Sequence, residues 1–289
     1  MPHSLSLLFA LFFIFSTIAL GQNASTSSKT FTLFNNCQET IWPAITTKSD
    51  NTHGGFTLKP SQSAFYNAPT GWSGRIWART GCNFDKNGNG TCQTGGCGTT
   101  LNCSGPSNPP NTIAEFTLGD LDYYDVSLVD GFNVPIAITP LKGKGNCSIA
   151  GCDGDLRLNC SSQLVSKSDG KVIACRSACD VFETDEFCCR GAYSDPVLCL
   201  PSNYSKSFKQ VCPAASSYAF DGLSSIITCS ASDYIVAFCA SRNQTFCSYH
   251  DDKLVCNTSS NGSQALSQKW WILVLKVALP LIFLLQFKF

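Results

Sequence analysis

Eighteen cysteines constrain the fold of this 289-residue chain more than any other feature. They follow an apolar run, Leu5–Leu20, which ends in the small residues of a secretory signal peptide, with cleavage expected after Gly21. Cysteines at this density in the secretory route are typical of disulfides, because the cytosol keeps thiols reduced. After removal of the signal peptide, His53 and His250 are the only histidines that could bind zinc together with the cysteines, which disfavours zinc sites. The sequence therefore predicts a cross-linked, secreted protein with no metal and no cofactor.

Short apolar segments separated by Gly, Pro, Asn and Ser predict an all-β sandwich or barrel in the first half of the chain. Asn35-Asn36 is expected to form a hairpin turn between the first two of these segments. The apolar segments are 31–34, 40–46, 56–58, 63–66 and 75–79.

From Cys147 to Cys229 the composition changes to cysteine, glycine and serine with few strand-length apolar runs. Such a segment is expected to be a satellite held by cross-links rather than by a core of its own. Residues 177–188 have an apolar side at roughly helical spacing and predict a short helix. Residues 226–227 and 234–238 return to a strand pattern and are expected to rejoin the sandwich.

Two strands with alternating polarity, 113–118 and 124–128, place several carboxylates on one surface. Their apolar residues share one face, while Glu115 and Asp125 point to the other, and residues 120–122 form the turn between them. Asp130 follows where the second strand leaves the sheet. A single outward carboxylate is ordinarily a solvated side chain. Neighbouring like charges destabilise a sheet, however, so three of them favour a binding or catalytic role.

The C-terminal residues resemble a glycosylphosphatidylinositol (GPI) attachment signal. A small polar cluster, 257–263, precedes a polar spacer, 264–269, and a terminal apolar tail, 270–287. The alternative is a single transmembrane helix, which needs about 20 apolar residues. Lys276 and Pro280 within the tail count against that alternative. A lipid anchor would place the protein on the outer face of the plasma membrane.

The residue that would carry the lipid is Asn261, Ser260 or Ser259. N-glycosylation sequons are frequent along the chain, and those at Asn243 and Asn257 are the best candidates for occupied sites. Without the signal peptide and residues 264–289, 17 basic and 20 acidic residues remain, a net charge of −3. The sequence has no basic patch, which excludes a nucleic-acid binder.

One cysteine-containing motif, Gly88-Asn-Gly-Thr-Cys-Gln-Thr-Gly-Gly-Cys97 followed by Cys103, resembles the signature of the thaumatin-like proteins, a plant pathogenesis-related group. The segments 74–80, 128–135, 175–179, 187–189 and 208–213 resemble the same family. The resemblance implies a mainly β fold, a flattened antiparallel β-sandwich with a disulfide-rich, loop-dominated second domain that carries a short helix. The expected organisation is a signal peptide (1–21), a polar leader (22–29), the thaumatin-like domain (30–240), a polar glycosylated stalk (241–263) and the C-terminal signal (264–289).

Sixteen cysteines fall in the order of the family, and the resemblance implies their pairing. The implied disulfides are Cys37–Cys239, Cys82–Cys92, Cys97–Cys103, Cys147–Cys229, Cys152–Cys212, Cys160–Cys175, Cys179–Cys188 and Cys189–Cys199. Cys247 and Cys256 lie beyond the family region and are predicted to pair with each other. The sequence departs from the family signature at Gly96, where the family usually has Asp, and this difference bears on the geometry of the local loop.

The resemblance also implies an acidic cleft between the sandwich and the cysteine-rich region. Its members are expected at Arg75, Glu115, Asp125, Asp130 and Asp221. Two functions are compatible with such a cleft. The first is a monomeric, non-enzymatic defence protein that binds β-1,3-glucan, another cell-wall carbohydrate or an electropositive partner.

The second function is a weak endo-β-1,3-glucanase, in which Glu115 is the acid and Asp125 or Asp130 the partner carboxylate. Such chemistry needs carboxyl groups about 5 Å apart for retention or about 6.5–9.5 Å apart for inversion. The aromatic side chains of Tyr123, Phe132 and Tyr218 either stack on sugar rings or pack in the core.

Overall fold

The computed structural model describes residues 28–48, 53–103, 105–230, 233–250 and 253–258. The predicted signal peptide, most of the polar leader, the anchor signal and its attachment residues lie outside the described residues. Within the described ranges, no helix is long and apolar enough to cross a membrane.

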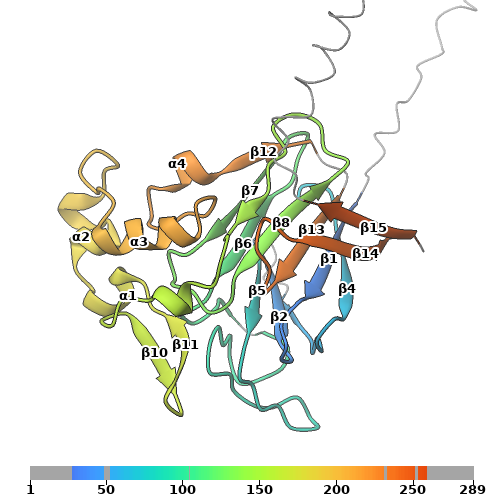
Figure 1. Ribbon diagram of the computed structural model, residues 1–289, viewed down its shortest axis with the longest axis horizontal. Helices are drawn as coiled ribbons and strands as arrows, with labels where there is room; N and C mark the ends of the chain where they lie inside the picture. The colour runs from blue at the N-terminus through green and yellow to red at the C-terminus, as the bar shows by residue number, and fades with distance from the viewer. Residues whose placement is uncertain (1–27, 49–52, 104, 231–232, 251–252, 259–289) are drawn as a thin grey trace, which may run out of the picture.

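Two β-sheets pack face to face and form the body of the protein (Figure 1). The five-stranded sheet has the order β4 (Ser63–Ala68), β1 (Lys29–Asn35), β13 (Asp233–Phe238), β8 (Ile136–Leu141) and β9 (Ala150–Gly151). The six-stranded sheet has the order β12 (Ile227–Cys229), β7 (Asp122–Ser127), β6 (Ile113–Thr117), β5 (Ser73–Arg79), β2 (Trp42–Thr47) and β3 (His53–Gly55). Neighbouring strands are antiparallel except β1 and β13, which run parallel. The mainly antiparallel sandwich agrees with the predicted fold class.

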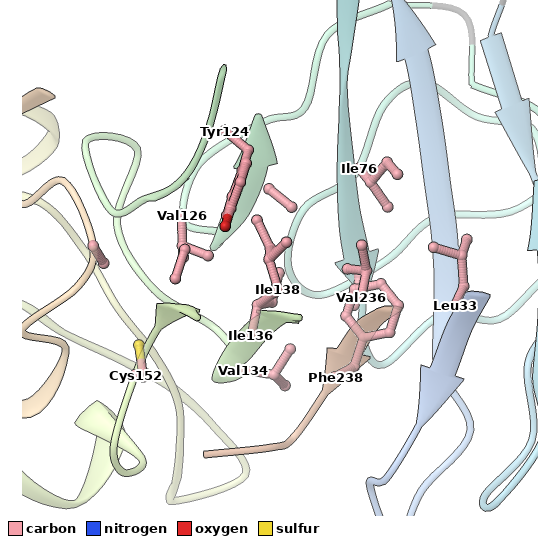
Figure 2. Close-up of a cluster of buried hydrophobic side chains, with 14 of the residues drawn as sticks. Leu33, Ile76, Tyr124, Val126, Val134, Ile136, Ile138, Cys152, Val236 and Phe238 are labelled. Carbon is pink, nitrogen blue, oxygen red and sulfur yellow. The ribbon is translucent and has the colours of Figure 1, made fainter. Parts of the chain in front are cut away.

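Alternate residues of each strand point between the sheets and form the main core, part of which is seen in Figure 2. The ring of Phe31 lies at its centre, with its centroid 4.7 Å from that of Phe116 and 5.5 Å from that of Tyr234. Trp72 packs edge-on against Phe31 at 5.4 Å. Tyr124 and Val126 of β7 also point into this core, so the predicted inward face of that strand is confirmed.

The predicted hairpin turn at Asn35-Asn36 is wrong, because β1 and β2 belong to different sheets. The buried side-chain amide of Asn35 donates to the carbonyl oxygens of Glu39 and Leu58, at 3.0 and 2.9 Å. These bonds stabilise a connection that carries the chain from one sheet to the other. An Asn pair is compatible with both outcomes, and the partner strands of β1 are β4 and β13, the latter about 200 residues away.

The cysteine-rich region contains short helices and a small hairpin. Its elements are η1 (Leu156–Asn159), β10 (Val165–Ser168), β11 (Lys171–Cys175), α1 (Ala178–Phe182), α2 (Asp185–Cys188), η2 (Gly191–Tyr193), α3 (Asn203–Val211) and α4 (Gly222–Ser225). The single helix predicted at 177–188 is divided in two, because Glu183 has a φ of 53° and Thr184 caps α2. Leu156 and Phe208 belong to the main core, so the region is not held by cross-links alone.

Eight disulfides are present among the described residues, and their pairing is the same as that implied by the family resemblance. The segment predicted as a stalk contains a two-stranded hairpin, β14 (Thr245–His250) and β15 (Lys253–Thr258), that the sequence analysis did not anticipate. Its register places the backbone of Cys247 opposite that of Cys256. A disulfide between these two residues stays a prediction.

Candidate functional site

Three of the five predicted cleft residues form one rung across the six-stranded sheet. Arg75 of β5 lies opposite Glu115 of β6, and Glu115 lies opposite Asp125 of β7. Directly opposed residues share a face of the sheet, so all three side chains lie on the face away from the main core. Their neighbours along the strands, such as Ile76, Phe116 and Val126, point into the main core, so the period of two in a strand places these three side chains on the outer face.

This outer face carries a cleft with a volume of about 420 Å³. The rung Arg75–Glu115–Asp125 lines it, together with hydroxyl-bearing side chains such as Ser107 and Thr117. Tyr123 also lines the cleft and is 47 % exposed. The cleft therefore combines charged groups, hydroxyl groups and an accessible aromatic ring.

An ion pair joins two members of the rung. The Nε atom of Arg75 is 2.7 Å from Oε1 of Glu115, and both side chains are partly exposed. An exposed pair of this kind adds about 0–1 kcal/mol to stability. Its effect on the site is to orient the two side chains on the floor of the cleft.

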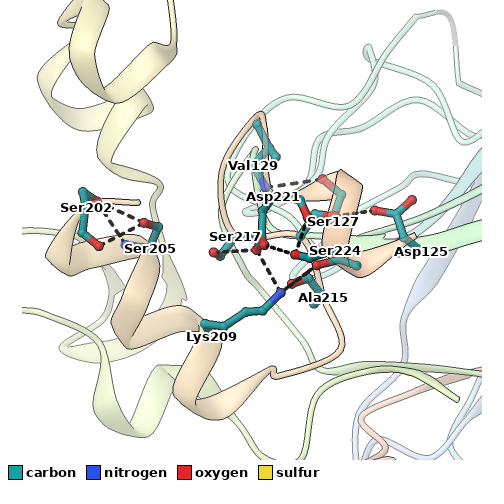
Figure 3. A network of polar contacts seen from close by, with 12 residues as sticks. Asp125, Ser127, Val129, Ser202, Ser205, Lys209, Ala215, Ser217, Asp221 and Ser224 are labelled. Atoms are coloured by element: carbon teal, nitrogen blue, oxygen red, sulfur yellow. Dashed lines mark hydrogen bonds and ion pairs between the residues drawn. The ribbon is translucent and has the colours of Figure 1, made fainter. Parts of the chain in front are cut away.

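Asp125, at the other end of the rung, lies in an environment that disfavours its ionised form. It is 9 % exposed, and its Oδ2 atom accepts a hydrogen bond of 2.8 Å from the hydroxyl of Ser216 (Figure 3). Burial, with a smaller contribution from the charge of Glu115, raises the pKa of Asp125 to about 6. A carboxyl group held at such a pKa in a cleft is typical of a functional site.

Asp221 has the opposite environment, and it does not line the cleft with the rung. Its Oδ2 atom lies 3.0 Å from Nζ of Lys209 and accepts hydrogen bonds from the backbone N–H and the hydroxyl of Ser217, at 2.8 and 2.9 Å (Figure 3). Burial raises the pKa of this carboxyl, but the hydrogen bonds from Ser217, Lys209 and Ser224 outweigh burial and hold it below its usual value. Asp221 therefore ties α3 to α4 and has an architectural role in the present structure.

Asp130 lies just beyond β7, half-buried, and it too is absent from the residues that line the cleft of the rung. Its backbone carbonyl accepts the N–H of Asn111 at 3.1 Å. Burial raises the pKa of its carboxyl, and the attraction of Arg75 partly opposes this rise. Asp130 is thus coupled to the rung through Arg75 without lying on the cleft floor.

The three aromatic candidates have different positions. Phe132 is fully buried, so a stacking role for it is wrong, and core packing accounts for the residue. Tyr218 is half-buried beside a separate cavity of about 50 Å³ that Phe208 also lines. Tyr123 alone of the three lines the cleft. At the departure from the family signature, the carbonyl of Gly96 accepts the N–H of Asn108 at 2.6 Å, so the loop is closed by its backbone.

Two important partners of the carboxylates were missed by the sequence analysis. Ser216 and Lys209 approach Asp125 and Asp221 from the segment around α3, a helix that was not predicted. A signal for α3 exists, because Tyr204, Phe208 and Val211 follow a helical spacing after the capping residue Ser202. No pattern in the sequence indicates which carboxylate these residues contact.

The substitution Asp125→Asn is expected to stabilise the protein at neutral pH. The raised pKa means that ionised Asp125 disfavours the folded state above about pH 6, and that this cost disappears as the pH falls to about 4. The variant should therefore gain on the order of 2 kcal/mol in free energy of unfolding at pH 7.5 and about none at pH 4. Denaturant titrations at both pH values provide the measurement.

The matched control is Asp221→Asn, which should destabilise the protein at pH 7.5, because the lowered pKa of Asp221 means that its ionised form stabilises the fold. That contribution is lost as the pH falls through the lowered pKa. Equal effects of the two substitutions at pH 7.5 would contradict the opposite environments described above.

The sequence matches the model of the thaumatin family over residues 35–240. Pathogenesis-related thaumatin-like protein 3.5 of Cryptomeria japonica is 51 % identical over 215 residues, which cover 73 % of this chain and 90 % of that protein. Pathogenesis-related protein 5 of Arabidopsis thaliana is 47 % identical over 241 residues, 82 % of this chain and 99 % of that protein. The solved structure of a thaumatin-like xylanase inhibitor aligns with a TM-score of 0.42 and 26 % identity, over 73 % of this chain and 99 % of the inhibitor. This chain belongs to the thaumatin family.

Proposed function

We propose that this protein is a secreted, thaumatin-like defence protein whose cleft binds β-1,3-glucan without cleaving it. The rung Arg75–Glu115–Asp125 on the cleft floor is the observation that carries the proposal. Sugar hydroxyl groups both donate and accept hydrogen bonds, and the rung offers a guanidinium donor beside two carboxylate acceptors. Tyr123 provides a ring for the apolar face of a sugar. The names of the relatives, pathogenesis-related proteins, support a role in defence.

The contacts within the rung favour binding over catalysis. A glycosidase presents one protonated carboxyl group to the leaving oxygen and a second carboxylate to the sugar carbon. Glu115, the expected acid, is ion-paired with Arg75 at 2.7 Å. Asp125 accepts the hydroxyl of Ser216 and is nearly buried. Both carboxyl groups already have partners, which suits the recognition of hydroxyl groups.

A slow endo-β-1,3-glucanase is the second candidate, and the raised pKa of Asp125 favours it. In this case Asp125 supplies the proton and Glu115 is the nucleophile, the reverse of the roles expected from the sequence. Opposed residues of neighbouring strands have Cβ atoms about 4.5–5.5 Å apart. That spacing is compatible with the roughly 5 Å of retaining enzymes.

The substitution Glu115→Gln tests the binding proposal. Loss of the carboxylate removes a charged acceptor and frees Arg75, so the affinity for soluble β-1,3-glucan should fall about tenfold or more. Binding is measured by calorimetry and by co-sedimentation with insoluble glucan, with new reducing ends assayed in the same samples. Glu39→Gln, an exposed carboxylate in the connection after β1, is the matched control and should bind like the parent protein.

The outcomes of this experiment separate the candidates. Unchanged binding by the Glu115 variant would contradict a role of the rung in recognition. Reducing ends that appear with the parent protein and vanish with both Glu115→Gln and Asp125→Asn would make the protein a glucanase. Binding without new reducing ends supports the recognition function.

The proposed site of action is the outer face of the plasma membrane. Residues 264–289 serve as a GPI attachment signal, with the lipid at Asn261 or Ser260, and glycans are attached at Asn243 and Asn257. The membrane-bound protein is a monomer. Phospholipase C specific for phosphatidylinositol should release it from intact cells, and retention after treatment would favour the transmembrane alternative.

A further inference from the structure

The five-stranded sheet is buried on both faces, which a two-layer sandwich does not require. Its inner face contributes Leu33 and Val236 to the main core. Its outer face contributes Ile235 of β13 and Leu141 of β8 to a second, separate hydrophobic cluster, and Ala137, Ala237 and Ala240 complete that cluster. The outer face of an antiparallel sheet normally alternates to polar residues that meet water.

One rung of this outer face is shielded from water. Ile235 lies between Thr32 of β1 and Thr139 of β8, and all three residues are buried. Neither threonine hydroxyl has a hydrogen-bond partner among the described residues. Hydroxyl groups on an open sheet face would be hydrated, so another part of the chain must exclude water from this rung.

The hairpin β14–β15 is in the right place to do so. It follows the region that matches the family, residues 35–240, and β14 lies against β1. Figure 1 shows the hairpin crossing β1 and β13. Its position beside the five-stranded sheet accounts for a buried outer face that the two sheets alone leave unexplained.

Contacts at the start of the hairpin fix its direction. Arg242 forms an ion pair with Asp153, with Nε 2.7 Å from Oδ1, and its backbone N–H donates to the carbonyl of Cys152 at 2.9 Å. The side-chain amide of Asn36 donates to Oε1 of Gln244 at 3.3 Å. The chain is therefore held against the domain on both sides of the point where the hairpin begins.

We infer that the hairpin β14–β15 is an intramolecular cover for the outer face of the five-stranded sheet. It adds a third layer to the two-layer family domain and excludes water from the rung Thr32–Ile235–Thr139. The cleft lies on the outer face of the other sheet. The hairpin, which ends at Thr258, therefore lies on the side of the molecule opposite the cleft. For a lipid-anchored protein, a consequence that rests on the proposed function, the cleft faces away from the membrane.

The experiment uses the full chain with a recognition site for a sequence-specific protease inserted between Arg242 and Asn243. The melting temperature is measured before cleavage, and again after the hairpin fragment has been removed. Removal should lower it by about 5 °C or more, because apolar surface around Ile235 becomes exposed. A fragment that stays bound under native conditions after cleavage also supports the inference. An unchanged melting temperature after removal would overturn it.

Two neighbouring substitutions on opposite faces of β13 sharpen the test. Ile235→Thr should lower the melting temperature of the uncut protein and have little effect once the fragment is removed. Val236→Thr, which faces the main core, should lower it equally in both forms. The same effect of Ile235→Thr before and after removal would contradict the cover.

Glucan binding by the cleft is measured in the same samples. Cut and uncut proteins should bind soluble β-1,3-glucan equally, because the hairpin and the cleft lie on opposite faces. Failure of both forms to bind glucan would refute the proposed function and leave the cover intact. A lower melting temperature after removal with unchanged glucan binding supports both conclusions.

Discussion

The substitution Asp122→Asn is expected to lower the free energy of unfolding at pH 7 by about 3–5 kcal/mol. Asp122 is fully buried at the start of β7 and forms an ion pair with Lys29 of β1. Its carboxylate also accepts the hydroxyl of Tyr234 at 2.7 Å and the N–H of Gly119 at 3.1 Å. Asparagine offers one acceptor oxygen for three donors and leaves the ammonium of Lys29 without a counter-charge. Denaturant unfolding with the disulfides intact provides the measurement.

Asp120→Asn is the matched control, because Asp120 is exposed two residues earlier. Its substitution should change stability by less than about 0.5 kcal/mol. The double variant Lys29→Met with Asp122→Asn should recover part of the loss, since the unpaired ammonium is then absent. A loss below about 1 kcal/mol for Asp122→Asn alone would show that the buried pair is not a main link between the two sheets.

The substitution Phe31→Ala is also expected to lower the free energy of unfolding by about 3–5 kcal/mol, because it leaves a cavity in the core. The ring is fully buried and is surrounded by Tyr66, Trp72, Phe116 and Tyr234. These rings belong to strands of both sheets and to the β4–β5 connection, so they cannot all move into the vacated space. The melting temperature and the near-ultraviolet circular dichroism of the aromatic cluster should both decrease.

Phe65→Ala serves as its comparison. Phe65 lies in β4, next to β1 in the same sheet, and is 54 % exposed. Its removal deletes the same ring without leaving a cavity, and should change stability by less than about 1 kcal/mol. Similar losses for the two substitutions would mean that the core around Phe31 collapses onto the vacated space.

The alternation of apolar and polar residues in the sequence was sufficient to predict which face of the sheet carries the site. The inward side chains of β6 and β7 leave Glu115 and Asp125 on the opposite face, and the structure has this arrangement. The alternation does not reveal how deeply an outward residue is covered. Asp125 lies on the predicted face but is nearly buried, because Ser216 approaches it from a distant segment.

Contacts between distant segments explain the other differences. Asn35-Asn36 was interpreted as a local turn, whereas β1 pairs with strands remote in sequence. Asp221 was assigned to the cleft, but it contacts Lys209 of α3, a helix that was not predicted. The third layer formed by β14–β15 could not be foreseen, because these short strands lie beyond the family region and have no strong alternation of apolar and polar residues.

The parallel pairing of β1 and β13 and the disulfide next to it have a mechanical consequence for a domain that is pulled at its two ends. Without a cross-link, a force that separates the two ends of the domain would pull along these strands in opposite directions and load their hydrogen bonds in shear. The disulfide between Cys37 and Cys239 joins the chain just beyond both strands. Tension that enters through β1 passes directly across this bond to the C-terminal segment. The 201 residues enclosed by the disulfide, cleft included, carry no load, since the sequence separation of its cysteines is 202.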